Sequence, residues 1–248
     1  MQLPRSAWDV YTRQLDAQQR KAADLVLRSV KAYSALNPGY TVADMRDYCI
    51  EMMGQACQTY GTIGATLSAS MFDEVMAAAG IDAGSADLYD EVDGDRVDSL
   101  VRYQAGRLVG GDVDGFAKQL AGAASDWVAK CANRTQIYNT PGRVRYARIL
   151  TGRENCTFCT MLASRGFVYR TAKTAGAFDR WHRFCDCRVI SGVDSIEGYD
   201  TDALYDRWQA FEDIDARTHE DGAPWTKAEK DAAKADYAAQ NPVWSDSN

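Results

Sequence analysis

Five sulfur- and nitrogen-bearing side chains in the middle of the chain have the spacing of a zinc site. Cys156 and Cys159 form a C-x2-C pair, and His182 and Cys185 form an H-x2-C pair, with a further thiol at Cys187. The chain holds seven cysteines and two histidines, and five of these nine residues fall within one stretch of 32. Two such pairs joined by a loop can supply the four ligands of a closed tetrahedral zinc centre.

One tetrahedral ion takes four ligands, so the five candidates leave alternatives open. We expect Cys156, Cys159, His182 and Cys185 to bind the metal, with Cys187 in place of Cys185 as the main alternative. An all-cysteine site with His182 beside it is a second alternative. A third is a set of cysteines without metal, either reduced or joined as disulfides in an extracellular particle. A bound ion would replace the hydrophobic core that a segment of about 50 residues cannot assemble alone.

The same residues argue against a catalytic metal, which needs an open coordination position and a nearby base. His182 is followed by Arg183 and Phe184, so the H-x-E motif of zinc deaminases is absent, and H-E-x-x-H is absent as well. No phosphate-binding loop, dinucleotide-binding glycine motif or serine-hydrolase elbow is found. His219 lies in an acidic turn, where a solvated surface residue is expected. We therefore expect a structural Zn²⁺ and no enzymatic activity.

The charge balance limits the classes of partner. The chain has 35 acidic and 28 basic residues, a net charge of -7 and a pI near 4.9, which argues against a broad basic face for nucleic acid. The segment around the cysteines is nevertheless locally basic. Its arginines either neutralise the thiolates of the metal site or contact DNA or an acidic partner. The candidates for such contacts are Arg143, Arg145, Arg148, Arg153, Arg165, Arg170, Arg180 and Arg183.

The redox state of the cysteines follows from their setting. No secretory signal and no apolar run of roughly 18 residues is visible, so we expect a soluble protein. An odd number of cysteines in a chain without an export signal favours reduced thiols, and hence metal binding over a disulfide framework. Cys49, Cys57 and Cys131 lie alone in apolar helical surroundings and are expected to be buried.

The first 140 residues have the apolar periodicity of long helices. Ser6 with Asp9 and Thr41 with Asp44 resemble capping boxes at the starts of two of them. Residues 80–94 form an acidic loop, and two further helices follow, with a break at residues 110–111 and closure at residues 140–142. Three glycines in the second helix predict close helix packing or a break near Gly61; they are Gly54, Gly61 and Gly64.

The pattern changes after residue 140. Alternating apolar residues at 144–149 predict a short strand, and residues 167–169 and 188–190 could pair with it. A short helix is expected from Thr157 to Ser164, ended by Gly166 in a left-handed conformation. Helical patterning returns after residue 198.

These elements predict a mainly α protein in three parts. Residues 1–140 form a helical bundle or arm, residues 141–198 a small α+β module stapled by zinc, and residues 199–248 a C-terminal helical tail.

The cysteine module resembles a known family. Residues 152–169 (GRENCTFCTMLASRGFVY) and 181–187 (WHRFCDC) are similar to the C-x-x-C and H-x-x-C-x-C segments of Mu F-like minor capsid, or head morphogenesis, proteins of tailed bacteriophages. The versions in phages of actinobacteria are the most similar. Residues 198–205 (GYDTDALY) also look like the segment that follows this module in that family. The resemblance is specific over residues 146–205 and general for the helical first half.

The resemblance implies a structural protein inside the phage head that binds portal protein, major capsid protein or both. It implies roles in head assembly and in packaging or ejection of DNA, with the protein in the virion interior and in host cytoplasm during assembly. No membrane and no small-molecule substrate are expected. Some relatives carry a maturation protease or toxin domain, for which the 43 residues after Tyr205 are too few. The alternatives are a zinc-containing protease or nucleic-acid-processing enzyme and a DNA-binding zinc module.

Overall fold

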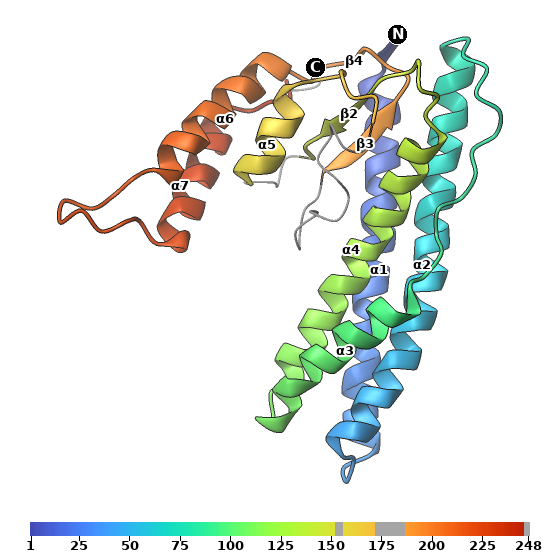
Figure 1. The fold of residues 1–248 in the computed structure, drawn as a ribbon, viewed down its shortest axis with the longest axis vertical. Coiled ribbons are helices and arrows are strands. Elements are labelled where there is room, and N and C mark those ends of the chain that lie inside the picture. Colours follow the sequence, from blue (N-terminus) through green and yellow to red (C-terminus); the bar gives the residue numbers. More distant parts are fainter. Residues whose placement is uncertain (152–155, 172–186, 246–248) are drawn as a thin grey trace. The chain divides into compact units, whose positions relative to one another are not determined.

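The computed structural model describes residues 1–151, 156–171 and 187–245, and most of them are helical, as predicted (Figure 1). The chain divides into two compact units. The helical unit comprises Val10–Glu74 and Gly84–Asn139. The mixed unit comprises Met1–Asp9, Val75–Ala83 and the chain from Thr140 onwards.

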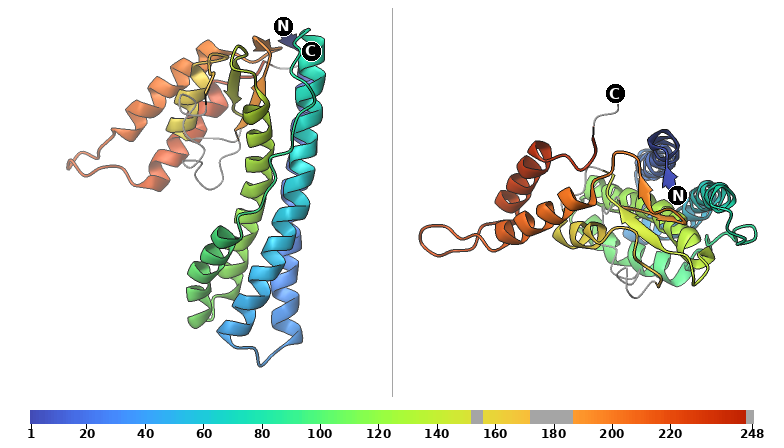
Figure 2. Two further views of the ribbon diagram at one scale, coloured as in Figure 1. Left: turned by 45° about the vertical axis from the view of Figure 1, so that its right-hand side comes forward. Right: turned by 90° about the horizontal axis from the view of Figure 1, so that it is seen from above.

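The helical unit is built from most of α1 (Arg5–Leu36) and α2 (Val42–Ala78) together with α3 (Gly94–Val109) and α4 (Val113–Asn139). Figures 1 and 2 show α1, α2 and α4 side by side. None of the described helices is both long and apolar enough to cross a membrane.

Acidic and hydroxyl side chains start these helices by accepting hydrogen bonds from otherwise unpaired backbone N–H groups. The predicted box before α2 is confirmed, since Thr41 Oγ1 accepts from Asp44 N at 3.2 Å and Asp44 Oδ2 accepts from Thr41 N at 2.8 Å. The box predicted at Ser6 is wrong, because α1 already begins at Arg5. Asp9 instead accepts a hydrogen bond from Arg5 Nε at 2.8 Å.

Close backbone packing holds α2 against α4. An added Cβ on Gly64 would lie 2.9 Å from both Val128 Cγ1 and Val128 O, and one on Gly61 would lie 2.8 Å from Trp127 Nε1. The helix is continuous through both glycines, so the expectation of close packing is confirmed and that of a break is not. One turn further on, Ser68 Oγ donates to Ala132 O at 2.6 Å.

The three isolated cysteines are buried in this core, as expected. Burial raises the pKa of Cys49, Cys57 and Cys131 to about 12, so these thiols stay protonated near neutral pH. They therefore act as small apolar residues of the core.

The described residues of the mixed unit form two small sheets. Strand β2 (Tyr146–Ile149) pairs antiparallel with β3 (Arg188–Ser191), and β1 (Gln2–Leu3) pairs parallel with β4 (Ser195–Ile196). The predicted strand at 167–169 is reduced to one bridge, in which Tyr146 and Tyr169 exchange backbone hydrogen bonds. Between these segments, α5 spans Thr157–Ser164 as predicted, and Gly166 follows it with a φ of +65°.

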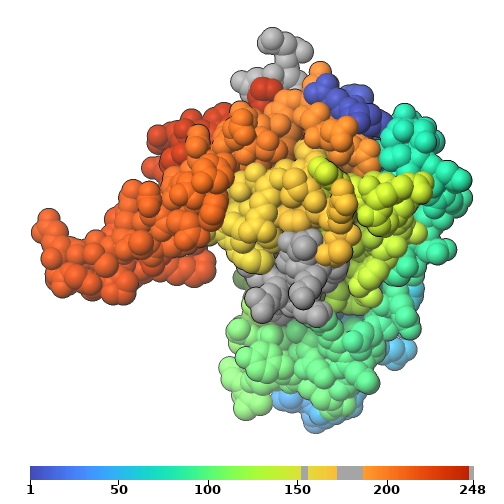
Figure 3. Space-filling view, turned by 45° about the horizontal axis from the view of Figure 1, so that its top comes forward, coloured from blue at the N-terminus to red at the C-terminus, as the bar shows by residue number. Residues whose placement is uncertain are grey.

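Helices α6 (Thr201–Asp215) and α7 (Lys227–Gln240) form a hairpin beside α5, and Figure 3 shows the yellow surface of α5 adjoining the orange surface of α6. Each helix of the hairpin receives a cation at its C-terminal end. Arg207 on α6 donates to Ala238 O and Asn241 O, and Lys230 on α7 donates to Asp215 O at 2.8 Å. Both cations lie at the negative end of the neighbouring helix dipole, which stabilises the pair.

Candidate metal-binding thiol site

Two of the five predicted ligands lie against each other in the mixed unit. The Cys159 and Cys187 sulfur atoms are 3.7 Å apart, and both side chains are buried. Cys159 is the third residue of α5, and Cys187 is the residue immediately before β3. The site therefore joins a helix to a strand.

Local structure explains how each thiol is held. Cys156 is the N-cap of α5, with φ -81° and ψ 119°, and its carbonyl accepts from Thr160 N at 2.9 Å. This places Cys159 on the first helical turn. On the other side of the site, pairing of Arg188 with Ile149 fixes the start of β3, and with it Cys187.

Arg148 of β2 supplies a positive charge to the two sulfurs. Its Nη2 lies 2.9 Å from Cys187 Sγ and 3.8 Å from Cys159 Sγ, and the side chain is only 2% exposed. A guanidinium in this position favours the thiolate form, which is the form that binds metals. Arg148, predicted as a candidate contact to DNA or a partner, therefore lies inside the protein beside the thiols.

The distance between the sulfurs fits zinc. With Zn–S bonds of about 2.3 Å and tetrahedral angles, two thiolate ligands stand about 3.8 Å apart. The observed 3.7 Å matches this value, and Cys187 was the alternative rather than the favoured fourth ligand in the sequence prediction. His182 and Cys185 lie outside the described residues.

Cys156 does not complete a larger cluster. Within the ranges that the structure describes, no three Cys, His, Asp or Glu side chains are placed to hold one ion together. The described portion of the site is thus the pair Cys159 and Cys187 with Arg148 beside it.

The other predicted arginines divide into two groups. Arg143, Arg145, Arg165 and Arg170 are exposed, whereas Arg153, Arg180 and Arg183 lie outside the described residues. Arg143 and Arg145 flank a shallow hollow of about 350 Å³ that Ile81, Val193 and Asp194 also line. Arg143 additionally donates to Asp82 O at 3.2 Å. His219 is exposed, with its Nε2 3.3 Å from a Glu229 carboxylate oxygen.

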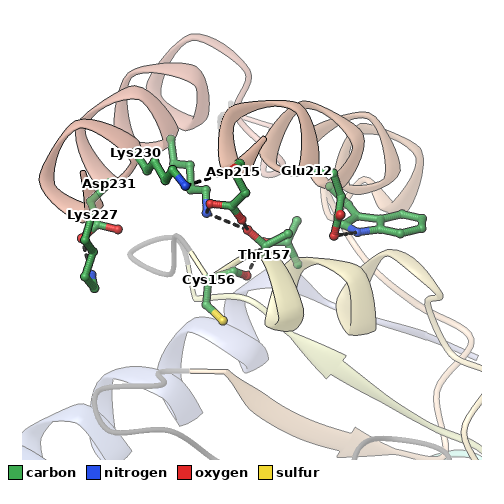
Figure 4. A network of polar contacts seen from close by, with 10 residues as sticks. Cys156, Thr157, Glu212, Asp215, Lys227, Lys230 and Asp231 are labelled. Atoms are coloured by element: carbon green, nitrogen blue, oxygen red, sulfur yellow. Dashed lines mark hydrogen bonds and ion pairs between the residues drawn. The ribbon is translucent and has the colours of Figure 1, made fainter. Parts of the chain in front are cut away.

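Sequence reasoning missed a polar network on the other side of α5. Thr157 Oγ1 donates to Asp215 Oδ2 at 2.6 Å, and Lys234 Nζ donates to Thr157 Oγ1 at 2.7 Å and to Asp215 Oδ1 at 2.6 Å. Figure 4 shows Thr157 and Asp215 facing each other next to Cys156. The three residues come from three helices, so no spacing within one segment could indicate the network.

Comparison with known proteins places the chain among phage proteins. The profile of the VG15 protein family matches residues 2–211. The gene 15 protein of Mycobacterium phage L5 is 31% identical over a stretch that covers 20% of this chain and 29% of that relative. No solved structure matches the chain. The family match and this relative indicate a phage protein of the actinobacteriophage type. By the match over most of its length, the chain belongs to the VG15 protein family.

Proposed function

We propose that this protein is a structural minor capsid protein of a tailed bacteriophage, placed inside the head, where it binds portal protein, major capsid protein or both. Family membership and the mycobacteriophage relative support a phage role. The observation that carries the proposal is the convergence of Cys159 and Cys187, because these thiols belong to the motif that resembles the Mu F-like head proteins. In this role the protein assists head assembly and the packaging or ejection of DNA.

The proposal includes one structural Zn²⁺ bound by Cys159 and Cys187, with two further ligands drawn from Cys156, His182 and Cys185. An ion at this position would cross-link the first turn of α5 to the start of β3. Arg148 would offset the negative charge of the thiolates. Four protein ligands leave no open position for a substrate or activated water, which is why we propose a structural rather than an enzymatic role.

Cross-linking of purified phage particles followed by mass spectrometry tests the head role. We expect cross-links from lysines of this chain to portal or major capsid protein, and none to tail proteins, which serve as the internal control. Absence of the chain from particles, or cross-links to tail proteins alone, contradicts the proposal.

The DNA-binding alternative has one observation in its favour, the exposed pair Arg143 and Arg145 beside a hollow. It makes a separate prediction: affinity for duplex DNA that falls steeply with salt. For a head protein that docks on other proteins, we expect the double variant Arg143→Ala, Arg145→Ala to bind duplex DNA at low salt no less than wild type does. A loss of this binding would favour the alternative.

A further inference from the structure

The network of Thr157, Asp215 and Lys234 lies on the face of α5 opposite to the thiol site. Successive residues of an α-helix are rotated by about 100°, so Thr157 and Cys159 point in directions about 200° apart. Thr157 meets the α6–α7 hairpin, and Cys159 meets Cys187. The first turn of α5 is thus held from both sides.

The network joins a buried lysine to a partly exposed carboxylate, since the Asp215 side chain is 41% exposed. The Lys234 side chain is 7% exposed, and its ammonium lies 5.5 Å from the centre of the Phe211 ring. Burial alone would raise the pKa of Asp215, but the hydrogen bonds from Lys234 and Thr157 outweigh it and lower that pKa. The carboxylate is therefore charged near neutral pH, and the lysine, the hydroxyl and the carboxylate restrain one another.

The same interactions favour a structural role for Thr157. Lys234 Nζ donates to a carboxylate oxygen of Asp215 at 2.6 Å. The hydroxyl of Thr157 also donates to Asp215 rather than to the amine. We therefore interpret these three groups as residues that fix geometry.

We propose that Thr157, Asp215 and Lys234 are positioning residues for the thiol site, and that the α6–α7 hairpin uses them to keep Cys159 at ligand distance from Cys187. Helix α5 has only eight residues, so a displacement at Thr157 is transmitted to Cys159 within the same turn. The expected effect on zinc affinity rests on the proposed zinc site. The expected effect on the separation of the two sulfurs is independent of that site.

The test compares Thr157→Val, which removes the hydroxyl at nearly constant shape, with Thr157→Ser, which keeps it. Lys234→Met is compared with Lys227→Met, because Lys227 is exposed and pairs with Asp231 on the same helix. Zinc affinity is measured by competition with a chromogenic chelator. In metal-free reduced protein, the rate at which dibromobimane bridges Cys159 to Cys187 is followed by peptide mapping.

We expect Thr157→Val and Lys234→Met to weaken zinc binding by about tenfold or more and to slow bridging, while Thr157→Ser and Lys227→Met stay within about twofold of wild type. Wild-type protein that binds no zinc overturns the metal proposal, and the bridging rates then still decide the positioning role. Unchanged affinity and bridging in folded Thr157→Val and Lys234→Met, judged by circular dichroism, overturn the positioning role.

Discussion

The sulfur atoms of Cys159 and Cys187 lie 3.7 Å apart although 28 residues separate them along the chain. Two buried thiols at this distance, beside the guanidinium of Arg148, are suited to shared binding of one soft metal ion. A site of this kind connects a helix to a strand in a unit where each sheet has two strands among the residues that the structure describes. Loss of a thiol ligand, the packing of α2 against α4, a buried tyrosine hydroxyl and acid pH can each be tested by a separate measurement.

Replacement of Cys187 tests the ligand assignment. We expect Cys187→Ser to reduce bound zinc from one ion per chain towards none, because a hydroxyl is a much poorer zinc ligand than a thiolate. Elemental analysis of reduced, freshly purified protein gives the stoichiometry. Cys57→Ala, in the helical unit, is the control and should retain the ion. Full zinc occupancy in Cys187→Ser would exclude Cys187 as a ligand.

Replacement of a glycine of α2 by alanine should change the free energy of unfolding in opposite directions at Gly64 and Gly54. Gly64→Ala places a Cβ 2.9 Å from the Val128 backbone oxygen, so we expect the free energy of unfolding to fall by about 1–3 kcal/mol. Gly54→Ala meets no atom within 4 Å and should raise it by about 0.5–1 kcal/mol through helix propensity. Urea unfolding followed by circular dichroism measures both. Equal effects at the two positions would contradict the close packing of α2 and α4.

The hydroxyl of Tyr199 is a structural acceptor in the mixed unit. It accepts a hydrogen bond from Leu150 N at 3.1 Å, and burial raises its pKa. Tyr199→Phe leaves this buried N–H without its acceptor and should cost about 1–3 kcal/mol. Tyr205→Phe, at a half-exposed position on α6, should change stability by less than about 0.5 kcal/mol. A neutral Tyr199→Phe in denaturant unfolding would show that the bond contributes little.

Acid should loosen the attachment of the hairpin to α5. The pKa of Asp215 is lowered from its ordinary 3.8 in the folded protein, so its ion pair stabilises the fold fully above that value. The stabilisation is lost as the pH falls through the lower, folded pKa. Hydrogen exchange of α7 amides should therefore accelerate relative to α2 amides below about pH 4.

Asp215→Asn provides the matched variant for this pH dependence. It removes the titrating group, so exchange in α7 should already be faster at pH 6, and the additional acceleration in acid should shrink. Asp213→Asn, on the exposed side of α6, is the control and should retain the wild-type profile. An unchanged acid response in Asp215→Asn would assign the effect to another carboxylate.

Elements with strong local signals were predictable from the sequence. Helix α5 begins at Thr157 and ends at Ser164 as predicted, because the apolar run and Gly166 agree. The box at Ser6 failed for a local reason as well. Pro4 O already accepts a hydrogen bond from Trp8 N at 3.3 Å, so the helix starts at Arg5 and Ser6 lies within its first turn.

Features made by distant residues were not predictable. Strands β1 and β4 have two residues each, which is too short for any alternation to appear. For the site, the cysteine spacing marked Cys159 and Cys187 among five candidate ligands, with Cys187 as the alternative to Cys185. The spacing could not show that Cys187 leads into β3 and lies against Cys159. The hydrogen bonds of Lys234 could not be predicted either, because its partners Thr157 and Asp215 lie on other helices, 77 and 19 residues away.

The parallel pairing of β1 with β4 constrains the order of events during biosynthesis. Gln2 aligns with Ser195 and Leu3 with Ile196, so β1 must wait until nearly two hundred further residues have been synthesised before it finds its partner. At about 5–20 residues per second, that delay lasts roughly 10–40 s. The contacts of the helical unit need nothing beyond Asn139, so it can mature while the first strand is still unpaired.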